Sequence, residues 1–115
     1  MTTVIGCCIE VHKGLGPGFL ESVYHRALEI ELAHNAIPFE TQEELAISYR
    51  GRFVGDHRLD LLVDGRLVVE LKTVEKLNKD HYAQVKSYMK AADRKVGLLV
   101  NFAGSTVDVR RVELK

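Results

Sequence analysis

Six apolar residues recur at every second position between residues 58 and 72, three on each side of a turn signal: Leu59, Leu61, Val63, Leu67, Val69 and Leu71. Alternation of this kind is typical of strands with one buried face. The dipeptide Asp64-Gly65 between the two sets is a strong signal for a β-hairpin. The pattern therefore predicts two antiparallel strands whose apolar faces both point to the core.

The same pattern predicts how the two strands pair, because a slip of one residue would turn a whole apolar set toward water. We expect Val63 opposite Leu67, Leu61 opposite Val69 and Leu59 opposite Leu71. A two-residue turn does not fit this register, so we expect a three-residue loop at residues 64–66 or a bulge. On the other face, the register sets Asp60 opposite Glu70, with Lys72 two residues further on.

Apolar periodicity along the rest of the chain predicts three helices and further strands. The expected helices cover about residues 3–13, 19–35 and 78–92, and the expected strands outside the hairpin cover residues 40–49, 96–100 and 107–112. The segment 96–100 is apolar on both faces, which is typical of a central strand, and 107–112 is expected at an edge. The element order ααβββαββ indicates an α+β, three-layer fold with a mixed sheet.

Two of these elements carry specific expectations about burial. The helix over residues 19–35 is expected to bury a wide apolar face, and the strand over residues 40–49 to be half-buried. The residues of these two faces are Leu20, Val23, Tyr24, Ala27, Leu28, Ile30 and Leu32 in the helix, and Leu45, Ile47 and Tyr49 in the strand.

The length of 115 residues is that of one domain, so we expect residues 1–115 to form a single unit with a modest core. Cys7 and Cys8 are adjacent and show no metal-binding spacing, which predicts small core residues of a cytoplasmic protein. No signal peptide and no apolar run of membrane-spanning length are visible, so no membrane association is expected.

The formal net charge is zero, which argues against a nonspecific polyanion binder. Residues 71–95, however, are locally basic, and a basic segment after the hairpin could hold a nucleic-acid backbone. An ordinary solvated helix face is the alternative. The candidate substrate-binding residues of this region are Lys76, Lys79, His81, Lys86 and Tyr88.

The opposed acids Asp60 and Glu70 are the strongest candidates for chemistry. At a separation of about 5 Å and an effective dielectric constant near 20, two carboxylates repel each other by about 3 kcal/mol. Mg²⁺ would neutralise them, because it takes one or two carboxylates and fills its other positions with water and phosphate oxygens. The alternative is that the acids splay apart on a solvated face and Lys72 compensates their charge.

Two helical residues are weaker candidates when taken alone. Glu21 falls in the first turn of the expected second helix, where the helix dipole by itself favours an acid. Gln84 lies beside His81 and Tyr88 on the third helix, where an amide can bind a metal-bound water or a phosphate, or simply form a polar edge of the core.

Several motifs in order along the chain resemble those of the GxxExxY proteins, a group within the PD-(D/E)xK nuclease superfamily. They are Gly18-Phe19-Leu20-Glu21-Ser22-Val23-Tyr24, the lead-in Ile9-Glu10-Val11-His12, the set Asp60, Glu70 and Lys72, and His81-Tyr82-Ala83-Gln84 with Tyr88. The resemblance runs from about Ile5 to Glu113. Leu59 stands where the superfamily name has proline.

The resemblance implies a restriction-endonuclease-like core and metal-dependent hydrolysis of phosphodiester bonds in DNA or RNA. Asp60 and Glu70, with the Leu71 carbonyl, would hold Mg²⁺ or Mn²⁺, and Glu21 would bind a metal water or a second ion. Lys72 and Gln84 would orient water or phosphate. A noncatalytic module that binds nucleic acid or a protein partner is the rival reading, a purely structural domain is a third, and the grip on substrate could need a homodimer or partner protein.

Overall fold

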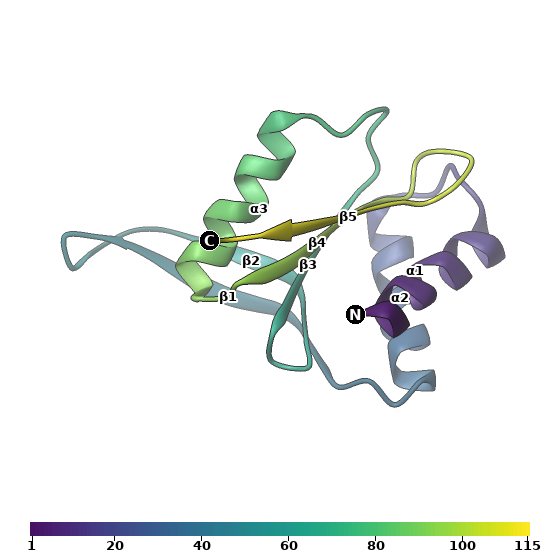
Figure 1. Ribbon diagram of the computed structural model, residues 1–115, viewed down its shortest axis with the longest axis horizontal. Coiled ribbons are helices and arrows are strands. Elements are labelled where there is room, and N and C mark those ends of the chain that lie inside the picture. The colour runs from purple at the N-terminus through teal and green to yellow at the C-terminus, as the bar shows by residue number, and fades with distance from the viewer.

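The computed structural model describes residues 1–115 and has the predicted order ααβββαββ (Figure 1). Its elements are α1 (Thr2–Leu15), α2 (Glu21–His34), β1 (Phe39–Tyr49), β2 (Arg52–Val63), β3 (Leu67–Lys72), α3 (Lys79–Ala92), β4 (Val96–Asn101) and β5 (Asp108–Glu113). None of the three helices has the length and apolar composition needed to cross a lipid bilayer.

The five strands form one mixed sheet in the order β1-β2-β3-β4-β5. Only β3 and β4 run parallel, because α3 connects them and returns the chain to the same end of the sheet. The larger core cluster packs α1 and α2 against one face, and the smaller packs α3 against the other. The predicted α+β, three-layer arrangement with a mixed sheet is therefore confirmed, with β4 central and β5 at an edge.

The register of the β2–β3 hairpin is the predicted one. Val63 pairs with Leu67 and Leu61 pairs with Val69, which leaves a three-residue loop at residues 64–66. Asp64 and Gly65 have φ angles of 54° and 65°, and the Arg66 amide donates to the Val63 carbonyl at 3.1 Å. Glycine adopts such angles without steric cost, so the turn follows directly from the sequence.

The pairing of β2 is interrupted on both sides at Asp60. The ladder with β3 stops at Leu61, and the ladder with β1 skips Asp60 and its neighbour Gln42, which has a φ of 54°. Leu59 then packs with the cluster beneath α3, and Leu61 with the cluster beneath α1 and α2. The expectation that Leu59 shares the face of Leu61 and pairs with Leu71 was wrong, because the strand is irregular between them.

Two other predicted apolar faces are narrower than expected. In α2 only Tyr24, Leu28 and Leu32 are buried, while Leu20 and Ile30 are 76% and 56% exposed. Tyr49 was expected to be half-buried, but it lies at the exposed end of β1. The helix touches the sheet along one stripe, and the outer half of the β1–β2 ribbon has no helix against it (Figure 1).

Tyr24 fixes the loop that leads into α2. Its hydroxyl donates to the Gly16 carbonyl at 2.6 Å and accepts from the Phe19 amide at 3.2 Å, and its ring stacks on Phe102 with centroids 4.6 Å apart. Gly18 has a φ of 106°, which disfavours any residue with a side chain. The glycine and the tyrosine together set where α2 begins, and thereby place its first residue, Glu21.

Candidate active site

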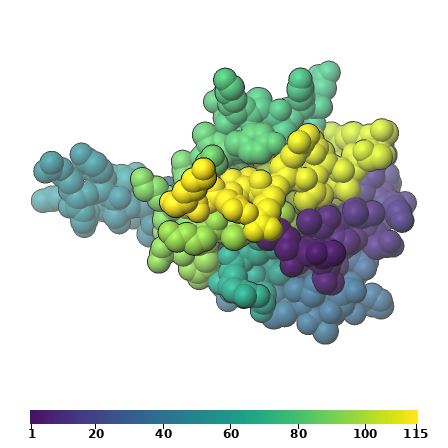
Figure 2. Space-filling view, in the orientation of Figure 1, coloured from purple at the N-terminus to yellow at the C-terminus, as the bar shows by residue number.

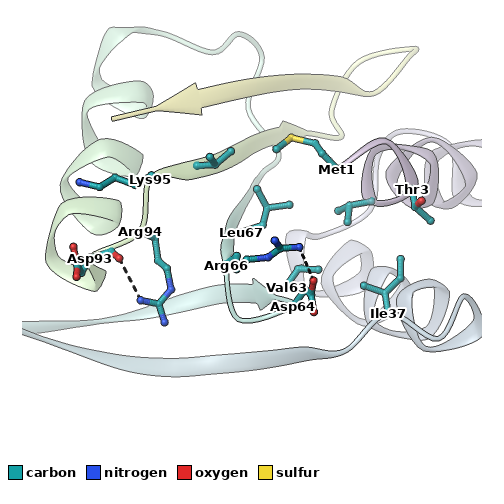
Figure 3. Close-up of a pocket in the computed structure, with 12 residues that line it drawn as sticks. Met1, Thr3, Ile37, Val63, Asp64, Arg66, Leu67, Asp93, Arg94 and Lys95 are labelled. Atoms are coloured by element: carbon teal, nitrogen blue, oxygen red, sulfur yellow. Dashed lines mark hydrogen bonds and ion pairs between the residues drawn. The ribbon is translucent and has the colours of Figure 1, made fainter. Parts of the chain in front are cut away.

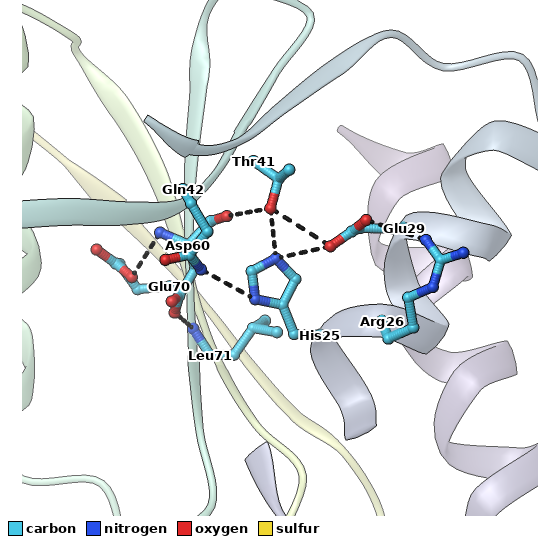
Figure 4. Close-up of polar contacts among 8 residues, drawn as sticks. All are labelled: His25, Arg26, Glu29, Thr41, Gln42, Asp60, Glu70 and Leu71. Atoms are coloured by element: carbon cyan, nitrogen blue, oxygen red, sulfur yellow. Dashed lines mark hydrogen bonds and ion pairs between the residues drawn. The ribbon is translucent and has the colours of Figure 1, made fainter. Parts of the chain in front are cut away.

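Asp60 and Glu70 lie where the β2–β3 ladder opens, and their carboxylates bind the free backbone amides there. The Leu71 amide donates to Asp60 Oδ2 at 2.7 Å, and the Asp60 amide donates to Glu70 Oε2 at 3.3 Å (Figure 4). Side-chain oxygens thus replace the carbonyl acceptors of a regular ladder. Each acid therefore accepts a hydrogen bond from a backbone amide of the opposite strand, at one place in the sheet.

Glu70 is buried, with only 4% of its surface exposed. Burial, together with the hydrogen bond and the charge of the neighbouring Asp60 side chain, raises the pKa of its carboxyl to about 9. The ammonium of Lys72 acts in the opposite sense but does not offset these effects. A group that would be an ordinary anion in water is therefore held protonated at neutral pH when no cation accompanies it.

His57 and Tyr88 cover Glu70 from the side of α3. His57 Nε2 lies 3.0 Å from Glu70 Oε1, and its ring stacks on the Tyr88 ring with centroids 3.6 Å apart. Burial lowers the pKa of His57, and burial together with the charges of Glu70 and Asp60 raises the pKa of Tyr88. At neutral pH, His57 is therefore an uncharged hydrogen-bond partner of Glu70.

Lys72 and Gln84 come from different elements and meet beside the acids. The ammonium of Lys72, at the end of β3, donates to the Gln84 side-chain oxygen at 2.9 Å. Gln84 reaches it from the middle of α3. The contact fixes the lysine head group, and Gln84 keeps its amide NH₂ free to donate to another group.

Glu21 joins the cluster through its charge. Burial raises the pKa of its carboxyl, the Asp60 carboxylate raises it further, and Lys72 and His25 lower it. The first residue of α2 therefore lies within electrostatic range of both Asp60 and Lys72. Of the five residues that the sequence singled out for catalysis, Asp60 and Glu70 meet in the sheet, Lys72 contacts Gln84, and Glu21 senses the charges of Asp60 and Lys72.

A second polar network supports Asp60 from the side of α2. His25 Nε2 lies 2.8 Å from Thr41 Oγ1 and 3.2 Å from a Glu29 carboxylate oxygen, and Thr41 Oγ1 donates to the Asp60 carbonyl at 3.4 Å (Figure 4). The strained Gln42 reaches His25 Nδ1 at 3.4 Å. The irregular β-strand geometry around Asp60 is thus held by side chains from two other elements.

Comparison with known protein families supports this geometry. A model of the PD-(D/E)XK nuclease superfamily matches residues 1–112. The chain belongs to this superfamily. No curated protein sequence matches the chain.

Among solved structures, the crystal structure of SSO0001 is similar to this member of the PD-(D/E)XK superfamily, with a TM-score of 0.64 and 22% sequence identity. The match covers 80% of this chain and 48% of the SSO0001 chain. The chain thus spans about half the length of that relative. The likeness shows the fold and is compatible with a restriction-endonuclease-like core.

The candidate substrate-binding residues do not share one surface with the acids. Lys79 and Lys86 are exposed on α3, and a step of about 100° per residue puts them on the side of the helix opposite Gln84 and Tyr88. Lys76 precedes the helix. The ring of His81 accepts a hydrogen bond from the Asn78 amide at 3.0 Å and so caps α3. Of the five candidates, only Tyr88 contacts the acid cluster.

A pocket of about 630 Å³ lies at the other end of the hairpin, beside the loop at residues 64–66 (Figure 3). Three of the charged side chains in its lining, Asp64, Arg66 and Arg94, already have partners. Arg66 binds Asp64 at 2.9 Å, and the Arg94 guanidinium donates to the Gly65 and Ala92 carbonyls at 3.0 and 2.9 Å. The pocket therefore lies between the hairpin turn and the end of α3, and none of the acids of the candidate active site lines it.

Nucleases of the PD-(D/E)XK superfamily usually use divalent metals. No three His, Cys, Asp or Glu side chains here are gathered as a metal-binding cluster. Mg²⁺ needs only one or two carboxylates, however, with water in its remaining positions. Asp60, Glu70 and the Leu71 carbonyl offer hard oxygen donors, and the buried Glu70 has no full countercharge. The donor set therefore fits Mg²⁺ or Mn²⁺.

Sequence reasoning did not find His57, His25, Thr41 or Gln42. His57 lies three residues before Asp60, and its role depends on α3 bringing Tyr88 against it. The others depend on the approach of α2 to β1. The one local signal of this network was the number of polar residues in the strand over residues 40–49, which was expected to be half-buried. That number does not indicate which side chains the polar residues contact.

Proposed function

We propose that the protein is a metal-dependent nuclease of the GxxExxY type, which hydrolyses phosphodiester bonds in DNA or RNA. The observation that carries the proposal is that the buried Glu70 meets the half-buried Asp60 at the open end of the hairpin, with Lys72 two residues further along β3. A pair of acids that a fold keeps partly protonated lowers the stability of the protein unless a ligand binds to the pair. Residues 1–115 would act as one nuclease-like unit.

In this proposal Asp60, Glu70 and the Leu71 carbonyl hold Mg²⁺ or Mn²⁺, and Glu21 binds a metal-bound water or a second ion. A bound cation would supply a more acidic water and charge stabilisation for the scissile phosphate. The phosphate would lie against the Lys72 ammonium, which offsets the negative charge that develops there. Gln84 holds this ammonium in place and offers its amide NH₂ to the attacking water or to a phosphate oxygen.

His57 and Tyr88 act on Glu70 rather than on the substrate. The hydrogen bond between His57 and Glu70 fixes the orientation of the Glu70 carboxyl, and the stacked Tyr88 ring restricts the movement of His57. Free, buried Cys7 and Cys8 agree with the predicted cytoplasmic location, where thiols stay reduced.

A cleavage assay tests the proposal. Single- and double-stranded DNA and RNA are incubated with the protein in Mg²⁺, Mn²⁺ or EDTA, beside Asp60→Asn and Lys72→Ala. The matched control is Asp64→Asn, which makes the same chemical change in the exposed turn of the hairpin. We expect metal-dependent cleavage by the wild type and by the control, and a loss of at least about 100-fold in both site variants.

Metal binding measured by calorimetry without cleavage of any polymer would instead support a noncatalytic module. Absence of both binding and cleavage would leave only a structural role for the cluster. Cleavage that persists undiminished in Asp60→Asn would contradict the site assignment.

A further inference from the structure

The outer end of the β1–β2 ribbon projects from the body of the molecule as an arm, which we define as residues 47–55. Figure 2 shows it as a separate lobe, and no helix covers it. A two-residue turn closes it, because Tyr49 pairs with Arg52, and Arg50 and Gly51 have φ angles of 50° and 74°. A register shift next to Ile47 leaves Val54 as an extra residue and twists the ribbon.

The arm carries large apolar side chains that nothing in the chain covers. Tyr49 and Phe53 are each 67% exposed, and Val54 is 61% exposed. Directly paired residues share one face of a ladder, so Tyr49 lies with Arg52 on one face and Phe53 lies on the other. Each face of the ribbon therefore presents one aromatic ring to the outside. Such a concentration of apolar side chains on a short projecting segment marks an interaction surface.

The charge of the arm identifies the kind of partner. Arg50 and Arg52 are its only charged residues, and the Arg50 guanidinium lies 6.0 Å from the centre of the Tyr49 ring. Guanidinium groups bind phosphates in a bidentate way, and exposed aromatic rings stack on bases. In a duplex the bases already stack on one another, whereas an unpaired strand leaves their faces free. This combination fits single-stranded nucleic acid.

A second copy of this chain fits the arm less well. An exposed sheet edge pairs with another chain most readily when it is apolar and uncharged. Below the arm, the edge strand β1 carries three acids, Glu40, Glu43 and Glu44, which would oppose each other in such a pairing.

The arm and the candidate active site lie on one continuous strand. Asp60 lies seven positions after Phe53 in β2, which at roughly 3.3 Å per residue is about 23 Å. At the stacked spacing of roughly 3.4 Å per nucleotide, this distance corresponds to about seven nucleotides. A strand cleaved at the acids could therefore reach the arm only if it extends several nucleotides beyond the scissile phosphate.

We propose that the arm binds a single-stranded flank of the substrate, with Arg50 and Arg52 on its phosphates and Tyr49 and Phe53 stacked on its bases. This inference rests on the proposed nuclease function. It adds a substrate class to it, namely a nucleic acid with an unpaired segment of about seven nucleotides or more beside the cleavage point.

The test compares two double variants, Tyr49→Ser with Phe53→Ser and Arg50→Ser with Arg52→Ser. A first control is Arg66→Ser, which removes an exposed arginine from the turn at the far end of β2. A second is Ile30→Ser, which removes an exposed apolar side chain from α2. Binding to a labelled single-stranded 20-mer and to the matching duplex is measured by fluorescence anisotropy in Ca²⁺ over a range of salt concentrations.

We expect each arm variant to bind the single-stranded 20-mer about tenfold more weakly or worse, with a smaller loss on the duplex. The binding constant K falls as salt rises, with a slope of log K against log salt of about −0.7 per phosphate contact on a single strand. The arginine variant loses two such contacts, so its slope should be less steep by about 1.4. The aromatic variant should leave the slope unchanged. In Mg²⁺, cleavage of a hexamer too short to reach the arm should be as fast as in the wild type, while cleavage of the 20-mer slows. Both controls should behave as the wild type.

Normal cleavage and binding of the 20-mer by both arm variants would overturn this inference and leave the nuclease proposal standing. The inference would also be overturned if the arm variants cleaved hexamer and 20-mer with equal loss, or bound single strand and duplex with equal loss. A change in the molar mass of the arm variants, measured by light scattering, would overturn it in favour of a second copy of the chain as the partner. Wild-type protein that neither binds nor cleaves nucleic acid would overturn both proposals.

Discussion

The two ends of the β2–β3 hairpin use the same strands for opposite purposes. At the turn, Leu61, Val63, Leu67 and Val69 pair in register and are buried. At the other end the ladder opens at Asp60, and a buried acid with a raised pKa takes the place of an apolar pair. The closed end stabilises the fold, and the stability it provides allows the open end to hold a group that an optimally packed core would exclude.

The largest expected effect is on the closed end. Leu61→Ala removes a fully buried side chain of the core cluster that packs α1 and α2 against the sheet, next to its ladder partner Val69. We expect the free energy of unfolding to fall by about 2–5 kcal/mol, because the cavity cannot collapse between two paired strands. Urea unfolding monitored by circular dichroism measures this loss. The control Ile30→Ala, on an exposed position of α2, should change it by less than about 0.5 kcal/mol.

At the open end, replacing the buried Glu70 should stabilise the protein at high pH, which is the opposite of the effect expected for Leu61→Ala. Glu70→Gln keeps an oxygen for the Asp60 amide but cannot ionise. In the metal-free wild type, the unfolded chain has lost this proton above its ordinary pKa near 4.5, whereas the folded chain keeps it up to about 9. The folded state therefore binds more protons, and its stability falls as pH rises, by up to about 1.4 kcal/mol per pH unit.

Urea unfolding in EDTA at pH 7, 8 and 9 tests this sign. Above pH 7 the lowered pKa of His57 contributes little, since that group is uncharged in both states. We expect the wild type to lose stability across this range and Glu70→Gln to lose much less. Glu113→Gln, an exposed acid on β5, should follow the wild type. A wild type that loses no more stability than Glu70→Gln between pH 7 and 9 would show that Glu70 is ionised in the fold.

The hairpin also shows which parts of this structure can be predicted from sequence. The closed end follows from local rules, because alternation of Leu61 and Val63 with Leu67 and Val69 fixes the register and Asp64-Gly65 fixes the turn. Those rules assume a regular strand, and they fail for Leu59, which lies beyond the irregular residue Asp60. The acids themselves were predicted from the register, whereas His57 was not. Its environment depends on how α3 packs over the sheet, which no spacing within β2 records.

A smaller effect is expected where His57 orients Glu70. His57→Phe keeps the stacking on Tyr88 and removes the hydrogen bond to Glu70 Oε1. Loss of such a supporting contact typically weakens metal affinity by about 10–100-fold. Calorimetric titration with Mn²⁺ measures it, beside His34→Phe at the end of α2 as a control.

The same titration carries an independent pH signature of the open end. In the proposed site a cation binds the Glu70 anion, so binding must release the proton that the buried group retains up to about pH 9. Mn²⁺ affinity of the wild type should therefore rise with pH between 7 and 9, by up to about tenfold per unit. An affinity that does not change over this range would exclude Glu70 as the ligand that gives up a proton.

The smallest expected effect concerns strained backbone, which occurs at both ends. Asp64 and Gln42 each have a φ of 54°, but Asp64 lies in a turn and Gln42 lies within β1 opposite Asp60. Aspartate tolerates this conformation better than glutamine does, because its short side chain can bond locally. Gln42→Gly should therefore raise the free energy of unfolding by about 1 kcal/mol, and Asp64→Gly by less. If instead Gln42→Gly destabilises the protein, the contact between Gln42 and His25 outweighs the strain. The irregularity at Asp60 would then be held in place by that side-chain network rather than merely tolerated by a strong closed end.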